Sequence, residues 1–148
     1  MHPVQSSRLR GRQIPPQLKK VVFAASFDEL DVALAARIKN MQQVFDAQFF
    51  FVSINTPGNF ITSRTAQHRL DKFIHGFKFV QVHTEIYNSL SEEAGILEFA
   101  DDIGADLIAM ATHGRTGILH LLTGSIAEDV VNHSKRPVLT LKTTAQKA

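Results

Sequence analysis

The sequence predicts an α/β fold, an open parallel sheet of five strands with helices on both faces. Short apolar runs of strand length alternate with longer segments in which apolar residues recur every three or four positions. Chains that alternate in this way form parallel sheets, because each helix carries the chain back across the sheet. The expected strands are 21–25, 49–54, 77–86, 107–111 and 137–141. The expected helices are 30–45, 66–76, 89–103 and 125–134.

The first strand and the first helix are separated by a turn with capping residues. Residues 21–25 form an apolar run without charge, as expected of a buried strand. Ser26 and Glu29 follow at the spacing of a capping box, which predicts the start of a helix. The apolar positions of that helix are Leu30, Leu34, Ile38, Met41 and Phe45. They recur at three- and four-residue steps, so one face of the helix is expected to pack on the sheet.

The third expected strand differs from the first two. Strand 49–54 ends in the polar turn 55–59, and helix 66–76 ends at Gly76. In 77–86, by contrast, apolar residues are interrupted by Gln81, His83 and Glu85. Such alternation predicts a strand that is less buried on one face and lies nearer an edge of the sheet.

The second half of the chain repeats the pattern twice. Ser89 and Glu92 have capping-box spacing at the start of helix 89–103, and Gly104 follows its end. Strand 107–111 carries no charge and reads as buried on both faces. Helix 125–134 and strand 137–141 complete the unit.

Length and composition are those of one globular domain. The chain has 148 residues and a mass of 16.5 kDa, of which 44% are hydrophobic and 20% charged. No run approaches the roughly 18 apolar residues that a membrane helix needs, so a soluble protein is expected. The chain has no cysteine, which excludes disulfides and cysteine-bound metals. The first twenty residues lack the apolar core of a secretory signal, so a cytoplasmic location is expected.

The basic character of the chain lies in its N-terminal arm. Residues 1–18 contain three arginines and no acid, which leaves thirteen basic against fourteen acidic residues in the remainder. The arm has neither helical nor strand periodicity, and we expect it to be flexible. The predicted organisation is therefore an arm at 1–18, a domain at 19–143 and a polar tail at 144–148. The domain has no basic stripe with interleaved aromatic residues, so nucleic acid is not an expected partner.

A glycine-bearing loop follows strand 107–111. Gly114 and Gly117 lie in this loop, and Gly124-Ser125 precedes the next helical pattern. A loop of this kind places main-chain N–H groups and the positive end of a helix dipole together, which suits a phosphate. A second interpretation needs no ligand: the glycines are turn residues, and Ser125 with Glu128 forms a capping box.

The loop resembles the nucleotide loop of the universal stress protein family. That loop contains a glycine, two residues, a second glycine, nine residues and a third glycine before serine or threonine; here Gly114 and Gly124-Ser125 match, and Ala111 replaces the first glycine. The resemblance is specific over residues 106–142 and follows the order of elements over residues 20–142. It implies a Rossmann-like fold of the adenine nucleotide alpha hydrolase type, with strand order 3-2-1-4-5.

In this strand order a crevice opens between the carboxyl ends of the first and fourth strands. The resemblance implies that ATP or a related adenine nucleotide binds there, alone or with Mg²⁺, in a universal stress-type regulatory protein. The nucleotide-binding residues that it implies are Ser26, Ile54, Met110, Ala111, His113, Gly114, Gly124, Ser125 and Ile126.

Two departures from the family pattern support an alternative. ATP-binding members have an aspartate where this chain has Ser26, and Asp28 follows two residues later. A serine hydroxyl accepts hydrogen bonds more weakly than a carboxylate, whose charge-assisted bonds contribute on the order of 1.5–3 kcal/mol. Ala111 adds a methyl group, which matters if the main chain approaches a phosphate closely at this position. The alternative is a dimeric interaction module of the same family that binds no nucleotide.

A slow ATP-hydrolysing or phosphotransfer enzyme is the second alternative. His113 and Arg115 adjoin the loop, but neither has a partner carboxylate at a meaningful spacing. No lysine follows the glycine as in a P-loop, and the seven histidines show no metal-ligand pattern. No catalytic or metal-binding residue is therefore assigned.

The last strand predicts how the protein assembles. In the implied order it lies at an edge of the sheet, where main-chain groups are unpaired. Val138, Leu139 and Leu141 make this edge apolar, and Pro137 and Lys142 protect only its ends. Antiparallel pairing with a second copy would cover it, so a homodimer through this strand is expected. The alternative is that residues 143–148 fold back over the edge.

Overall fold

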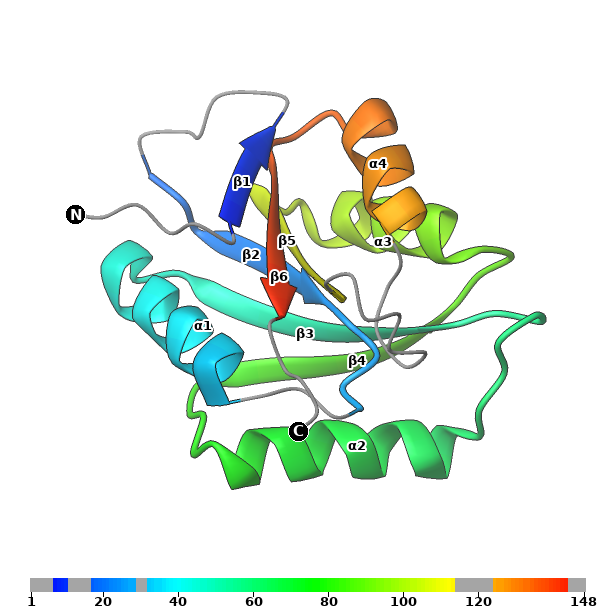
Figure 1. The fold of residues 1–148 in the computed structure, drawn as a ribbon, viewed down its shortest axis with the longest axis horizontal. Helices are drawn as coiled ribbons and strands as arrows, with labels where there is room; N and C mark the ends of the chain where they lie inside the picture. The colour runs from blue at the N-terminus through cyan, green and yellow to red at the C-terminus, as the bar shows by residue number, and fades with distance from the viewer. Residues whose placement is uncertain (1–6, 11–16, 29–31, 114–123, 144–148) are drawn as a thin grey trace.

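In the part of the chain that the structure describes, six strands form one sheet in the order β1-β6-β5-β2-β3-β4 (Figure 1). The structure, a computed structural model, describes residues 7–10, 17–28, 32–113 and 124–143. The strands are β1 (Ser7–Arg10), β2 (Lys20–Ala24), β3 (Gln48–Asn55), β4 (Val82–Asn88), β5 (Leu107–His113) and β6 (Val138–Thr143). The helices are α1 (Val32–Phe45), α2 (Ser63–Gly76), α3 (Glu92–Ile103) and α4 (Gly124–His133).

The strands β4-β3-β2-β5-β6 are parallel and confirm the predicted order 3-2-1-4-5. β2 is central: Ala24 pairs with Val52 of β3 on one side and with Met110 of β5 on the other. The chain leaves β2 and β5 in opposite directions across the sheet. The switch point of the topology therefore lies between the carboxyl ends of these two strands.

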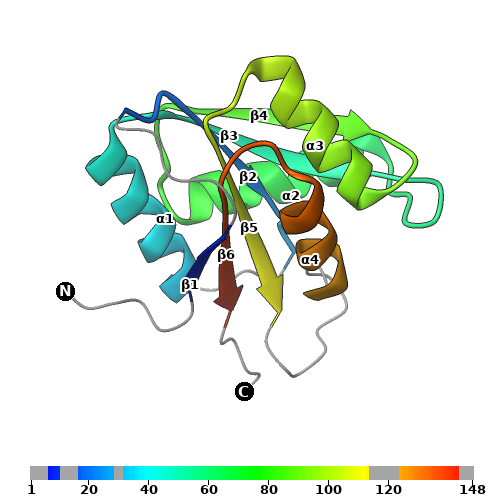
Figure 2. The ribbon, with the colours of Figure 1, turned by 90° about the horizontal axis from the view of Figure 1, so that it is seen from above.

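The two faces of the sheet are covered by different helices (Figure 2). α1 and α2 pack on one face, where Leu34 and Leu70 are buried with the odd-numbered side of β2. α3 and α4 pack on the other face, where Ile96 and Val130 are buried with the opposite side of the same strand. The predicted helices on both faces are thus confirmed.

Phenylalanine side chains dominate the face under α1 and α2. Phe51 is fully buried, and its ring centroid lies 5.1–5.8 Å from those of Phe23, Phe27, Phe73 and Phe79. Most of these pairs meet edge to face or tilted, which is the favoured arrangement of aromatic rings. This cluster joins β2, β3 and α2 into one core.

The prediction that strand geometry begins at residue 77 is wrong. β4 begins at Val82, and the segment before it contains two residues with left-handed backbone, Lys78 (φ 59°) and Gln81 (φ 57°). These turns bring Phe79 into the aromatic core, where it is 5% exposed. β4 itself alternates between half-buried and exposed residues at the edge of the sheet, as predicted.

Two helix starts differ from their predicted capping residues. The N-cap of α3 is Ser91, whose Oγ accepts from the N–H of Ala94 at 3.1 Å, while Ser89 Oγ donates to Glu98 Oε1 at 3.0 Å. Gly104 ends α3 in a left-handed conformation, as predicted. α4 begins at Gly124, so Ser125 lies inside its first turn instead of preceding it.

The predicted arm without regular structure and the predicted open edge at β6 are both wrong. Residues Ser7–Arg10 form β1, which pairs antiparallel with β6 from Val138 to Leu141. The sheet therefore has a sixth strand, and β6 lies between β5 and β1. An unpaired strand edge attracts any segment that satisfies its N–H and C=O groups, and here the N-terminal arm does so.

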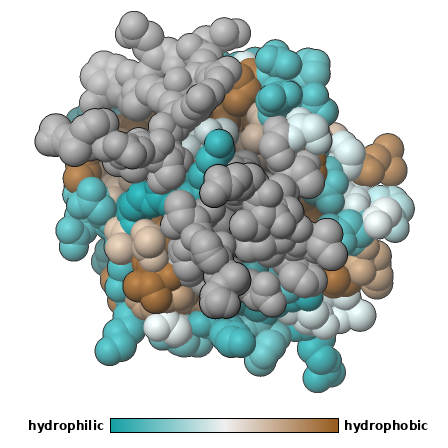
Figure 3. All heavy atoms as spheres, in the orientation of Figure 1, coloured by the Kyte–Doolittle hydropathy of each residue, from teal (hydrophilic) through white to brown (hydrophobic). Residues whose placement is uncertain are grey.

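Large apolar side chains that remain exposed come from separate parts of the chain: Val32, Val44, Phe60, Val80 and Leu90. On the face of the molecule in Figure 3, apolar residues lie in separate small groups between hydrophilic ones. Among the helices that the structure describes, none has the length and apolar character to cross a membrane.

Candidate functional site

The carboxyl ends of β2 and β5 carry several of the residues assigned to a ligand. Ser26 follows β2 by two residues, and Met110 and Ala111 belong to β5. α4 runs back along β5 from the end of the sheet to which the β5 arrow points (Figure 2), so Gly124 starts its helix at this same end. Gly114 lies outside the described residues, and of His113 and Gly124 only the main chain is described.

Phe27 fixes the turn that follows β2. Its backbone is left-handed (φ 61°), a conformation that costs a bulky residue free energy. Its side chain is 4% exposed and lies against Phe23 and Phe51 at centroid distances of 5.6 and 5.7 Å. Burial of this ring offsets the backbone strain. The two polar residues on either side of Phe27 are thereby held at the end of the sheet.

Both of these polar side chains already have partners in the protein. The N–H of Asp28 donates to Ser26 Oγ at 3.4 Å. The carboxylate of Asp28 forms an ion pair with Arg69 of α2 at 3.6 Å. The Ser26 hydroxyl therefore helps to close its own turn, and Asp28 is directed toward α2. Sequence reasoning missed Arg69, because its partner is 41 positions away and no local pattern connects them.

Met110 and Ala111 are fully buried and face opposite sides of the sheet. Met110 belongs to the core under α3 and α4, and Ala111 to the core under α1 and α2. Their side chains serve packing in this structure. A contact of either residue with a nucleotide stays a prediction.

The first turn of α4 is amphipathic. Ser125 is exposed, whereas Ile126 is half-buried against the core that contains Ala127. The far end of the helix is tied to α3, because His133 Nδ1 lies 2.7 Å from Glu93 Oε2. The N-terminal N–H groups of a helix lack partners within it and carry its positive dipole end. This end of α4 can therefore receive an anion.

Gly95 is a residue of this region that sequence reasoning missed. A Cβ atom at Gly95 would lie 2.5 Å from Cγ2 of Ile54 and 3.1 Å from Cβ of Ser89. The absence of a side chain thus lets α3 approach the carboxyl end of β3, where the predicted site residue Ile54 lies. A glycine within a helical pattern was the available signal, since it often marks a close approach.

A second missed group lies where β3 and β4 end. Asn55 Nδ2 donates to Asn88 Oδ1 at 3.3 Å, and Asn55 Oδ1 accepts from the N–H of Ile61 at 3.0 Å. Asn59 Nδ2 donates to Glu92 Oε2 at 3.4 Å and so links the β3–α2 loop to α3. These bonds order the loops beside Ile54. Within the described ranges, no group of three or more His, Asp or Glu side chains is arranged to hold a metal ion.

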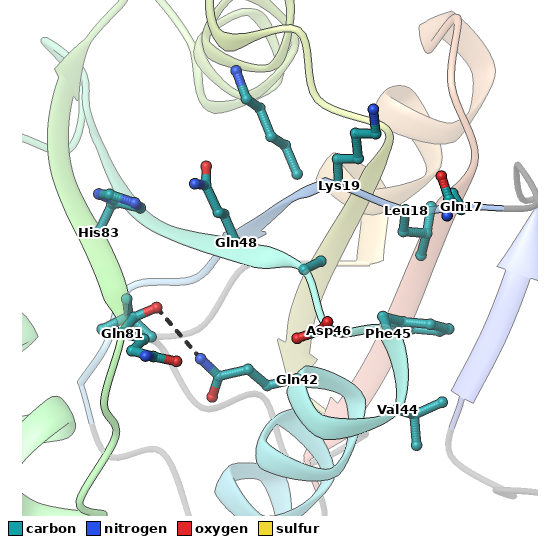
Figure 4. Close-up of a pocket in the computed structure, with 13 residues that line it drawn as sticks. Gln17, Leu18, Lys19, Gln42, Val44, Phe45, Asp46, Gln48, Gln81 and His83 are labelled. Atoms are coloured by element: carbon teal, nitrogen blue, oxygen red, sulfur yellow. Dashed lines mark hydrogen bonds between the residues drawn. The ribbon is translucent and has the colours of Figure 1, made fainter.

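A cavity of about 1010 Å³ lies at the opposite, amino end of the strands (Figure 4). Several of its polar groups hold the fold together. Asp106 Oδ2 accepts from the N–H groups of Lys19 and Lys20 at 2.9 and 3.1 Å, and Gln42 Nε2 donates to the carbonyl of Gln81 at 3.4 Å. Ligands of open α/β sheets bind at the carboxyl ends of the strands, so the candidate ligand site is the one at β2 and β5.

The sequence and the fold both match known proteins. A model of the universal stress protein family matches residues 63–142. Universal stress protein MJ0531 of Methanocaldococcus jannaschii is 29% identical over 140 residues, which cover 84% of this chain and 82% of that protein. Universal stress protein MJ0577 of the same organism is 43% identical over 47 residues, 32% of this chain and 29% of that protein.

Two solved structures share the fold. The structure of MJ0577 has a TM-score of 0.66 at 20% identity and covers 88% of this chain and 99% of its own. A universal stress protein crystallised in complex with cAMP has a TM-score of 0.65 at 17% identity, covering 86% of this chain and 99% of its own.

Proposed function

This chain belongs to the universal stress protein family, and from that premise we propose that it is a regulatory protein that binds ATP or a related adenine nucleotide between the carboxyl ends of β2 and β5. The observation that carries the proposal is the start of α4 at Gly124-Ser125, at the switch point of the sheet. That a family member of the same fold was crystallised with cAMP supports adenine as the base.

The phosphates would lie on the first turn of α4. Main-chain N–H groups and the helix dipole stabilise negative charge at such a turn, each typically by 0.3–1 kcal/mol. Ser125 is exposed in this turn. Mg²⁺, if it accompanies the nucleotide, would be held by the phosphates and water, since it usually keeps several waters when it binds phosphates.

The adenosine part would lie beside Ser26 and Ile54. The Ser26 hydroxyl accepts from the N–H of Asp28 and keeps lone-pair capacity and its own proton for a ligand. A nucleotide bound in this way would contact α4, which packs on one face of the sheet, and the β2–α1 turn, whose Phe27 packs on the other face. Occupancy would thus couple the two halves of the domain, as a regulatory ligand must.

The proposal is tested by calorimetric titration with ATP and with cAMP, and by acid extraction of the purified protein. We expect Gly124→Val to abolish binding, because a branched side chain would occupy the space next to the N–H groups of α4. Gly76→Val is the matched control: it lies at the end of α2, and a Cβ there meets nothing within 4 Å. Unchanged affinity in Gly124→Val, with Gly76→Val also unchanged, would contradict the proposal.

One observation favours the second candidate, an interaction module without nucleotide. Ser26 and Asp28, the two residues available in place of the family's aspartate, both have protein partners. An empty acid extract together with no heat of binding for ATP or cAMP would support that module. Release of ADP or phosphate from bound ATP would instead support a slow enzyme.

A further inference from the structure

The outer edge of β6 is occupied by the chain's own N-terminal strand (Figures 1 and 2). β1 pairs antiparallel with β6 in a register that joins Ser7 to Leu141, Leu9 to Leu139 and Arg10 to Val138. The next carbonyl of β6, that of Lys142, accepts from Arg37 Nη2 of α1 at 2.8 Å. Among the residues that the structure describes, this edge is therefore covered by four main-chain residues and one arginine side chain.

Without β1, the edge would attract another strand. Val138 and Leu141 are 0% and 1% exposed, and Leu139 is half-buried against the aromatic core, so β6 is an apolar strand. A long apolar strand with unpaired N–H and C=O groups is a template for pairing with a further chain. The parallel pairing with β5 spans Val138–Thr143 and fixes β6 in the sheet along this length.

We propose that β1 takes the place of a second copy of β6, so that the N-terminal arm keeps the chain monomeric and its release allows two copies to pair through β6. Two copies of β6 related by a two-fold axis run antiparallel, which is the direction in which β1 pairs. The two arrangements use the same main-chain groups of β6 and exclude each other.

The second copy is the better partner by length. β1 contributes four residues, whereas β6 has six, so a self-paired edge covers more of the strand. β1 is also short and carries Arg8 and Arg10, which are features of edge strands that resist further pairing. What favours β1 is that it belongs to the same chain, since an intramolecular segment has a high effective concentration. The balance therefore depends on the arm.

The first experiment weakens β1 in the full chain. In an antiparallel pair, the N–H groups of successive residues point to opposite sides of the strand, so either Arg8 or Leu9 donates to β6. The double variant Arg8→Pro/Leu9→Pro therefore removes this N–H donor in either case. Light scattering should give the wild type the 16.5 kDa mass of one chain and this variant about twice that mass at the same concentration. Arg8→Gln/Arg10→Gln keeps the main-chain donors and should stay monomeric.

The second experiment locks β1 in place. The chain has no cysteine, and Leu9 and Leu139 are register partners, which places their Cα atoms roughly 4.5–5.5 Å apart, within the range of a disulfide. Oxidised Leu9→Cys/Leu139→Cys should be monomeric at every concentration. Reduction should restore the behaviour of the wild type.

Three results would overturn the proposal. One is a double-proline variant that is folded by circular dichroism and keeps the mass of one chain at concentrations about tenfold above those used for the wild type. Another is a wild type that is dimeric, together with an oxidised Leu9→Cys/Leu139→Cys variant that has the same dimeric mass. The third is a disulfide that joins two chains on a non-reducing gel, because β1 would then belong to the other copy.

Discussion

The two faces of the sheet are packed with different side chains. The face under α1 and α2 is a cluster of phenylalanine rings around Phe51. The face under α3 and α4 is built mainly from aliphatic residues, among them Val22, Ile96, Ile108 and Val130. Among the residues that the structure describes, Phe99 is the buried aromatic residue of that face, and the partly buried Phe50 and Tyr87 contact its ring.

This difference separates two tasks. Large rings bury much apolar surface and make a rigid core. α4, whose first turn is the proposed phosphate site, packs on the face with fewer buried aromatic rings. We therefore expect substitutions under α1 and α2 to change stability, and substitutions under α3 and α4 to change ligand binding as well.

The largest effect is expected from Phe51→Ala. Phe51 is fully buried and contacts four other rings, so its loss should lower the free energy of unfolding by about 3–5 kcal/mol. Phe60→Ala is the control: Phe60 is 67% exposed, and its substitution should change that free energy by no more than about 0.5 kcal/mol. Urea denaturation measures both. Equal effects of the two variants would mean that the ring cluster does not anchor the fold.

Gly95→Ala tests the close approach on the other face. The new Cβ would meet Ile54 Cγ2 at 2.5 Å, so we expect a loss of about 1–3 kcal/mol although alanine favours a helix by about 1 kcal/mol. ATP affinity should fall too, because Ile54 must move. In Gly76→Ala the new Cβ would meet open space, so this variant should not lower the free energy of unfolding. Adding Ile54→Ala to Gly95→Ala should recover part of the loss in a double-mutant cycle.

Ser26→Asp tests whether the β2–α1 turn contributes to binding. A carboxylate in place of the hydroxyl offers the nucleotide a charge-assisted hydrogen bond, about 1 kcal/mol stronger than a neutral one, and should tighten ATP binding about fivefold to tenfold. Ser26→Asn has a similar size without the charge and should give little gain. Calorimetry measures both. Unchanged or weaker binding in the aspartate variant would show that this turn does not contact the ligand.

The smallest effect is expected from pH. The hydrogen bond from Tyr87 to Asp102 Oδ2 at 2.7 Å, followed by burial and the charges of Asp102 and Glu98, raises the pKa of Tyr87 from 10.0 to about 12. The pKa is higher in the folded state, so the stabilisation is complete below pH 10 and is lost as pH rises toward 12. The difference in unfolding free energy between the wild type and Tyr87→Phe should shrink over that interval. A constant difference would contradict the assignment.

The sheet was predictable because its signals are local. Strand order came with the family resemblance, and the periodicity of Leu34 and Ile38 correctly placed the inner face of α1. The segment at 77–81 was misassigned because an alternating pattern does not reveal left-handed residues such as Lys78. Ser89 and Ser91 both precede α3, and only tertiary contacts select Ser91 as its cap.

The contacts that shape the candidate site were less predictable. Asp28 meets Arg69, and β1 meets β6 across about 130 positions of sequence. Pairing over such separations depends on the assembled sheet, and local composition carries no trace of it. The four residues of β1 also lie between prolines and glycine, which indicated an irregular arm.

The contact between Tyr87 and Asp102 also gives the protein an optical reporter. The chain has one tyrosine and no tryptophan, so its near-ultraviolet emission comes from a single phenol at the junction of β4 and α3. A carboxylate that accepts a hydrogen bond from the phenol quenches tyrosine fluorescence. Separation of α3 from β4 would therefore appear as a brightening. The weak absorbance of such a chain also means that an adenine retained through purification would dominate its ultraviolet spectrum.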